Sequence, residues 1–166
     1  DKTNSEELKN IWKIIGPQQN RTKGPFHRIR TAYKACDYCI NNNIEGDFLE
    51  FGVWKGGIIG LMTLLAQNEN KQRKCWAFDS FEGMPKPAGI DEQKIWKQSM
   101  NFTSLESFLK IVKNDLYRVE AVKGFYNMSL PKFKLKSEEK IALAYIDCDY
   151  HSSTVECLNF IKDKLQ

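Results

Sequence analysis

The sequence lacks any long apolar run, which excludes a large class of proteins. No stretch approaches the ~20 consecutive apolar residues that span a bilayer, and the first ten residues, DKTNSEELKN, contain no apolar segment typical of a signal peptide. Basic residues outnumber acidic ones only by 25 to 21, and they are scattered instead of gathered into a stripe with aromatic residues. We therefore expect a cytoplasmic protein that binds neither a membrane nor nucleic acid.

The sequence also lacks the cysteine pattern of a disulfide framework or a zinc site. It has five cysteines, and an odd number cannot all pair within one chain. Reduced thiols are therefore the simplest interpretation. Cys36 and Cys39 form a C-x-x-C pair, but no second pair at zinc spacing accompanies it, and the surrounding segment predicts a helix. We therefore favour a structural role for this pair over a redox or metal role.

What is present is the composition of one soluble domain. The chain has 166 residues, of which 42% are hydrophobic and 28% are charged, and both fractions are typical of globular proteins. A chain of this size buries roughly 70% of its unfolded surface, so its core needs no disulfide or metal. We expect an N-terminal helix and linker over residues 1–25, with the helix at 5–14, and a single domain over residues 26–166.

Hydrophobic periodicity predicts alternating strands and helices in that domain. Thr103 and Glu106 have capping-box spacing and predict the start of a helix. A final helix is expected to open after Ser152 and Ser153 and to run to the end of the chain. The other predictions are helices over 26–42 and 58–66, strands over 47–53, 75–79, 119–123 and 141–147, a short helix before the last strand, and a long loop or lid over 81–100. This order predicts an α/β fold with a doubly wound, mostly parallel sheet.

The fourth predicted strand, IALAYI, is apolar on both faces, as in a strand that helices cover on both sides. In a sheet of order 3-2-1-4 this strand would lie at an edge with unpaired backbone groups. Nothing after the last helix is predicted to pair with it. We therefore expect the 166 residues to be part of a longer chain, whose further strands complete the sheet at the C-terminal side.

Ligands of open parallel sheets bind at the carboxyl ends of the strands. After the first strand, Gly52, Gly56 and Gly57 would let the backbone approach a ligand closely, although simple strand–helix packing would also explain them. Their spacing is not the G-x-G-x-x-G of dinucleotide binders, which favours a ligand of lower negative charge. At the end of the second strand, Asp79 is placed to accept hydrogen bonds from the hydroxyls of a ribose, or to cap a surface turn.

The two remaining strand ends carry further candidates. Gly124 and Phe125, after the third strand, could lie against an adenine or form only a turn. After the fourth strand, Asp147 and Asp149 either ligate a hard cation such as magnesium or divide into a ligand and a general base. His151 is an alternative base, but a solvent-facing loop position is favoured for it, and His27 is assigned no role.

Four segments together resemble the macrocin O-methyltransferase (TylF) family: GDFLEFGVWKGG, FDSFEGMP, KGFYNMSLP and IALAYIDCDYHSST. The resemblance covers about residues 26–160. It implies a Rossmann-like class I methyltransferase fold that uses S-adenosylmethionine to methylate a hydroxyl of a sugar or similar small natural-product acceptor. Glu50 and the loop from Gly52 to Gly57 would line the methionine part of this cofactor, and Asp79 with Ser80 would hold its ribose.

The same resemblance implies roles for the last cluster. Asp147 would be a magnesium ligand, and Asp149 would be the base that takes the proton of the acceptor hydroxyl. The adjacent pair of aspartates that completes the family's magnesium site is absent from the 166 residues. Trp54 is a candidate for the aromatic face that stabilises the positive sulfonium.

Two other interpretations stay open at this point. A nucleotide-dependent oxidoreductase would share the sheet, although the missing G-x-G-x-x-G disfavours it. A non-catalytic binding or assembly module would use an open sheet edge to accept a partner strand. The oligomeric state is left open, including a homo-oligomer.

Overall fold

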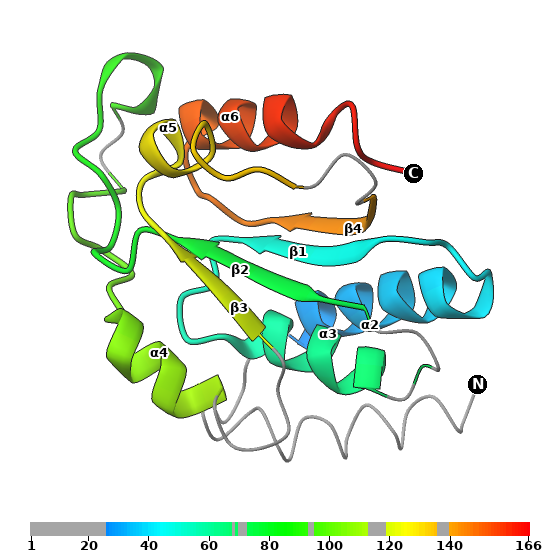
Figure 1. Cartoon of the computed structure of the whole chain (residues 1–166). Coiled ribbons are helices and arrows are strands. Elements are labelled where there is room, and N and C mark those ends of the chain that lie inside the picture. The colour runs from blue at the N-terminus through cyan, green and yellow to red at the C-terminus, as the bar shows by residue number, and fades with distance from the viewer. Residues whose placement is uncertain (1–25, 68, 70–72, 93–94, 113–118, 136–139) are drawn as a thin grey trace.

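The computed structural model describes residues 26–67, 69, 73–92, 95–112, 119–135 and 140–166. The predicted helix at 5–14 and the expected linker lie outside these residues. The described part contains a four-stranded parallel sheet of order β3-β2-β1-β4 (Figure 1). Its strands are β1 (Asp47–Phe51), β2 (Cys75–Asp79), β3 (Val119–Lys123) and β4 (Ile141–Ile146). The predicted α/β fold and strand order are confirmed.

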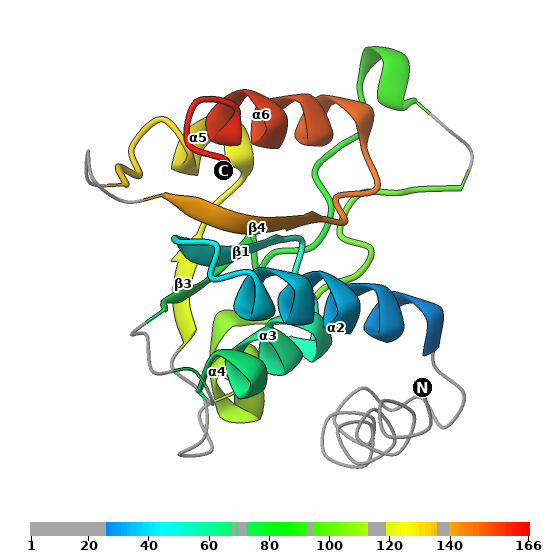
Figure 2. The same cartoon turned by 90° about the vertical axis from the view of Figure 1, so that its right-hand side faces the viewer.

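Helices cover both faces of the sheet, as the apolar strands require (Figure 2). One layer contains α2 (Phe26–Asn41), α3 (Gly57–Gln67) and α4 (Leu105–Val112), and the other contains α5 (Tyr126–Ser129) and α6 (His151–Ile161). Side chains of β1 alternate between two cores: Phe48 packs with the first layer, while Leu49 and Phe51 pack with the second. This sandwich holds the carboxyl ends of the four strands at one edge.

The amphipathic pattern of α2 is confirmed by its buried face. Ile29, Ala32, Tyr33 and Cys36 are all buried against the first core. By contrast, α3 is buried almost all round, which agrees with its uniformly apolar sequence. The glycine turn after β1 leads directly into α3, which begins at Gly57.

Two predicted helix boundaries are wrong. Helix α4 is capped by Ser104, whose Oγ accepts the N–H of Ser107 at 3.1 Å, and not by Thr103. Helix α6 begins at His151, before both serines, and ends at Ile161 before the end of the chain. The early start of α6 has a cause outside the helix, because a carboxylate of the lid accepts its first N–H groups.

The expectation that nothing after the last helix pairs with β4 is also wrong. Leu165 forms an isolated parallel bridge with Ile141. The N–H of Ile141 donates to the carbonyl of Lys164 at 2.9 Å, and the N–H of Gln166 donates to the carbonyl of Ile141 at 3.0 Å. The outer edge of β4 is therefore partly paired at its first residue.

The cysteines are all free thiols. Cys36, Cys39 and Cys75 are buried, and burial raises the pKa of Cys75 to about 12. The C-x-x-C pair thus lies in the core as the structural interpretation predicts. No helix among the described residues has the length and apolar character needed to cross a membrane.

Candidate active site

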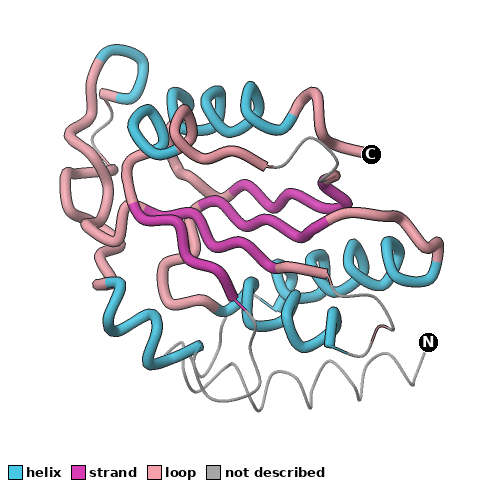
Figure 3. Tube along the Cα trace, viewed as in Figure 1, coloured by secondary structure: helices cyan, strands magenta, loops and turns pink. Residues whose placement is uncertain are grey.

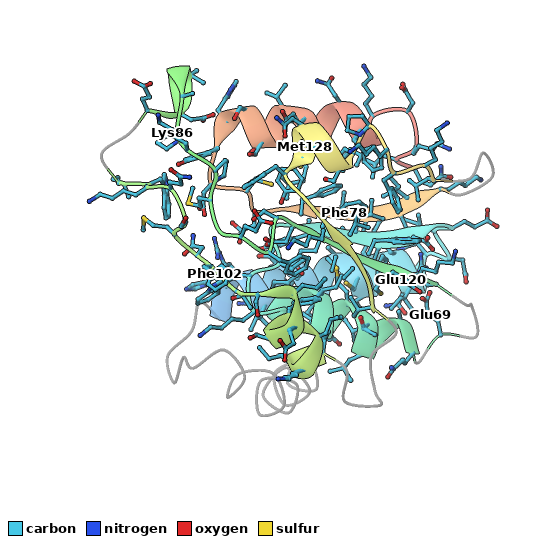
Figure 4. All side chains as sticks on the ribbon, turned by 60° about the vertical axis from the view of Figure 1, so that its left-hand side comes forward. Glu69, Phe78, Lys86, Phe102, Glu120 and Met128 are labelled. Carbon is cyan, nitrogen blue, oxygen red and sulfur yellow. The ribbon has the colours of Figure 1, made fainter. Side chains whose placement is uncertain are left out.

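A large cavity lies at the carboxyl edge of the sheet. Figure 3 shows that the loops gather at this edge. Its volume is about 570 Å³, within the range of roughly 300–1,000 Å³ that is typical of small-molecule sites. All four strand ends contribute to its wall, together with the predicted lid. Figure 4 shows Lys86 of the lid and Phe102, which follows the lid, on this side of the molecule, with Glu69 and Glu120 at the opposite end of the sheet.

The end of β1 brings a buried carboxyl group to the cavity wall. Glu50 is 3% exposed, and its Oε2 has no hydrogen-bond partner in the structure. Burial raises the pKa of Glu50 well above its ordinary value, and a backbone hydrogen bond from Ile59 opposes this only in part. A buried polar atom without a partner is costly, so Glu50 is poised to receive a donor from a ligand.

Glycine is required at one position of the turn that follows. Gly52 has a φ of +86°, and a Cβ there would collide with the backbone carbonyl of Asp147. The turn after β1 therefore lies directly against the loop after β4. Gly52, Trp54 and Gly57 all line the cavity, as predicted for a ligand-binding turn.

Gly56 does not line the cavity. Its Cα faces α4, where an added Cβ would lie 2.8 Å from Val112 Cγ1 and 2.9 Å from Phe108 Cε2. With a φ of +79°, it also has a backbone conformation that side chains rarely adopt. Gly56 therefore packs against α4, whereas Gly52 and Gly57 lie on the cavity wall.

Asp79 holds the glycine turn to the end of β2. Its Oδ2 accepts the N–H of Val53 at 3.0 Å and that of Trp54 at 3.2 Å. Its Oδ1 accepts the N–H of Phe81 at 2.8 Å. Burial raises the pKa of Asp79, and these backbone donors counteract the shift. The carboxylate shapes the turn while it also lines the cavity.

The other residues expected to contact the cofactor are brought to the same wall. Ser80, Gly124 and Phe125 line the cavity beside Asp79. The N–H of Gly124 donates to the carbonyl of Asp79 at 2.9 Å, which joins the ends of β2 and β3. Phe125 precedes the short helix α5.

Asp147 is paired with a residue that the sequence analysis did not single out. Arg28 Nη2 on α2 lies 2.8 Å from Asp147 Oδ1, and both residues line the cavity. Within the described residues, no cluster of three or more His, Cys, Asp or Glu side chains could hold a metal ion. The carboxylates that this part of the chain supplies therefore do not fit a complete magnesium site.

Asp149 lies on the same loop with a strained backbone, at a φ of +61°. Its Oδ2 accepts the side-chain N–H of Asn101 at 3.1 Å, and the carboxylate faces the cavity. Partial burial raises the pKa of Asp149, and the charge of Asp147 adds to this, while Asn101 and Arg28 oppose it. A carboxylate with a raised pKa beside a cavity fits the role of a general base.

His151 is exposed at the start of α6 and is absent from the cavity wall, in agreement with the solvent-facing interpretation. Sequence reasoning missed Arg28, Asn101 and Asp91 as functional candidates. No local motif marks them, because each acts through a partner at least 48 positions away. The proline-rich composition of the lid was a signal for Asp91 alone, since Arg28 lies on α2 and Asn101 follows the lid.

Comparison with known proteins decides the family. The family described as macrocin-O-methyltransferase (TylF) matches residues 14–166. The chain belongs to the TylF family. This confirms the resemblance found in the sequence, and the TylF match extends twelve residues before α2.

The curated relatives of this TylF chain carry O-methyltransferase names. It is 27% identical over 176 residues to the demethyldecarbamoylnovobiocin O-methyltransferase of Streptomyces niveus, covering 99% of this chain and 65% of that protein. It is 24% identical over 150 residues to the mycinamicin III 3''-O-methyltransferase of Micromonospora griseorubida, covering 83% and 58%. The chain thus spans less than two thirds of the length of these relatives.

Solved structures confirm the fold. The O-methyltransferase NovP matches with a TM-score of 0.77 at 23% identity, covering 98% of this chain and 80% of that one. The calicheamicin methyltransferase CalS11 matches with a TM-score of 0.67 at 21% identity, covering 98% and 74%. The Rossmann-like sheet predicted from the sequence is shared with both.

Proposed function

We propose that the full-length protein is an S-adenosylmethionine-dependent O-methyltransferase that acts on a hydroxyl of a sugar or similar small natural-product acceptor. The observation that supports this most strongly is one cavity, in a TylF-family chain, that receives side chains from all four family-like segments. Glu50, Asp79 and Asp149 all line this cavity. Its volume of about 570 Å³ suits a donor and an acceptor held side by side.

The residues at the β1 and β2 ends fit the cofactor. Glu50 offers a buried oxygen without a partner, Gly52 allows close backbone approach, and Asp79 reaches the cavity from the turn. Bound S-adenosylmethionine would supply a methyl group activated by a positively charged sulfonium. The Trp54 ring, which already has Lys55 Nζ 4.8 Å from its centroid, could present its face to that charge.

At the acceptor end, Asp149 would act as the base. An alcohol is a weak nucleophile at neutral pH, so removal of its proton by a positioned carboxylate accelerates attack. Asn101 orients the Asp149 carboxylate and leaves its second oxygen available for the acceptor hydroxyl. Holding donor and acceptor in one cavity supplies a further part of the rate.

Asp147 as a magnesium ligand is a separate proposal. The carboxylate faces the cavity, but in this chain its charge is balanced by Arg28. Because the described residues do not form a complete site, we assign no step of the reaction to a metal.

The lid suggests the character of the acceptor. Met84, Trp96 and Met100 give the lid an apolar inner wall, and the cationic side chains on the cavity wall are Arg28 and Lys86. Carboxylates on the same wall outnumber these cations even without Glu50, whose charged form burial disfavours; they are Asp79, Asp91, Asp147, Asp149 and Glu156. This balance favours an acceptor without net negative charge over a sugar nucleotide with a diphosphate. The relatives named for novobiocin and mycinamicin substrates agree with such an acceptor, whereas CalS11, which shares the fold, is named as a TDP-rhamnose 3'-O-methyltransferase.

Calorimetric titration of the full-length protein with S-adenosylmethionine tests the proposal. Asp79→Asn should weaken binding by on the order of tenfold or more, because hydrogen bonds to charged groups contribute about 1.5–3 kcal/mol. Asp163→Asn, an exposed carboxylate at the far end of α6, is the matched control and should bind as the parent does. Melting temperatures of both variants separate loss of the turn from loss of binding. No binding by the parent protein would refute the proposed function, and unchanged binding by Asp79→Asn would refute only the ribose contact.

A further inference from the structure

The lid is attached to the start of α6 by a buried carboxylate. Asp91, which ends the 3-10 helix η2 (Gly89–Asp91), is 3% exposed. Its Oδ1 accepts the N–H of His151 at 2.7 Å, and its Oδ2 accepts the N–H of Ser152 at 3.2 Å. A negative charge at this position also interacts favourably with the helix dipole.

Helix α6 has no cap of its own. The residue at its N-cap position, Tyr150, makes no side-chain capping hydrogen bond. Two of the N–H groups that every helix leaves unsatisfied at its start are therefore satisfied by a residue 60 positions earlier in the chain. The cap of α6 is present only while the lid lies on the helix.

Two weaker contacts accompany this cap. The hydroxyl of Tyr150 donates to the carbonyl of Pro85 at 3.4 Å. Directly after the lid, Asn101 donates to Asp149 at 3.1 Å. The start and the end of the lid are also joined to each other, since the N–H of Ser99 donates to the carbonyl of Met84 at 2.8 Å and the N–H of Met84 donates to the carbonyl of Met100 at 2.9 Å. The lid is thus closed at its base by these bonds and attached to α6 through Asp91.

We propose that Asp91 is a positioning residue that latches the lid onto α6 and thereby couples lid closure to the placement of Asp149. The coupling is short, because Asp149 precedes the first latched N–H by two residues and has a strained φ of +61°. Release of Asp91 uncaps the helix that follows Asp149, and opening of the lid also withdraws Asn101 from its carboxylate. The functional meaning of this latch rests on the proposed methyltransferase activity, in which Asp149 is the base.

Hydrogen–deuterium exchange of the full-length protein tests the latch without an acceptor. In Asp91→Ala, amides of Met84–Glu92 and of the first turn of α6 should exchange on the order of tenfold faster, since an N-cap is lost. Amides of β1 and β2 should keep their parental rates. Asp91→Asn retains an acceptor oxygen and should restore most of the protection. Glu92→Ala is the matched control, because it removes an exposed carboxylate one residue away.

A spectroscopic measurement distinguishes a residue that positions Asp149 from one that only stabilises the lid and α6. The carboxyl carbon resonance of Asp149 should shift in Asp91→Ala and not in Glu92→Ala, although the Asp91 carboxylate is bonded to the N–H groups of His151 and Ser152 and not to Asp149 itself. Parental exchange in the lid and α6, uniform acceleration across the sheet, or an unmoved Asp149 resonance would each overturn the latch. Absence of S-adenosylmethionine binding with the local exchange pattern intact would instead overturn the proposed function and leave the contact between lid and helix standing.

Discussion

At the scale of single residues, the cavity is governed by charges that lie close together. Arg28 reaches Asp147 from a helix that precedes it by 119 positions. The same guanidinium lowers the pKa of Asp149, which partial burial and Asp147 raise. The protonation state of the proposed base therefore depends on a residue that no motif near the base reveals.

Arg28→Gln should raise the pKa of Asp149 further. Asp149 works as a base only when ionised, so its activity is present above its pKa and is lost as the pH falls through it. Removal of a nearby cation disfavours the ionised form and moves that loss to higher pH. Carboxyl-detected NMR titration measures the shift, with Asp149→Asn to assign the resonance. Arg30→Gln, an exposed site two residues away on the same helix, should leave the titration unchanged; an equal shift in both variants would contradict the role of Arg28.

The packing role of Gly56 can also be tested against a matched control variant. Gly56→Ala combines a positive φ with a clash against Phe108 and Val112, whereas Gly89→Ala has a positive φ of +57° with open space around it. We expect Gly56→Ala to lower the free energy of unfolding by about 1–3 kcal/mol more than Gly89→Ala does, because overpacking adds to the backbone cost. Urea denaturation of the two variants measures this difference. Equal losses would mean that α4 moves aside at no cost.

At the scale of elements, the sequence predicts the bounds that a pattern within one segment determines. It does not predict the bounds that depend on contacts between distant segments. Strands β2 and β3 have the predicted bounds, because short β-prone segments ended by polar and turn residues define them locally. The start of α6 was predicted wrongly, since its cap comes from Asp91 in the lid. The candidate site followed the same division: the strand-end residues were predictable, whereas Arg28 and Asn101 enter only through the tertiary fold.

The cap of α4 gives a direct test at this scale. Ser104→Ala should lower the free energy of unfolding by about 0.5–2 kcal/mol, because the N–H of Ser107 loses its acceptor. Thr103→Ala removes a hydroxyl one residue earlier and should cost clearly less. Chemical denaturation of both variants distinguishes the cap seen in the structure from the one predicted by the T-x-x-E spacing, and the reverse order of losses would restore Thr103 as the cap.

At the scale of the whole molecule, ligand binding should raise the free energy of unfolding and the Tm. A ligand at 100 times its Kd stabilises the folded state by ~2.7 kcal/mol, which corresponds to a rise in Tm of roughly 5–10 °C for a domain of this size. We expect this rise with S-adenosylmethionine and none with NAD. A shift with NAD alone would favour the oxidoreductase interpretation, and no shift with either would favour the assembly module.

The cavity wall also includes two of the chain's four tryptophans, Trp54 and Trp96. Trp76 lies elsewhere: its indole N–H donates to Asp47 at 2.8 Å, and its ring packs edge-on to Phe133. Among the tryptophans that the structure describes, two are therefore reporters that an incoming molecule would touch and one is a reporter that it would not. Quenching and spectral displacement upon titration offer an optical assay that needs no label and no knowledge of the acceptor.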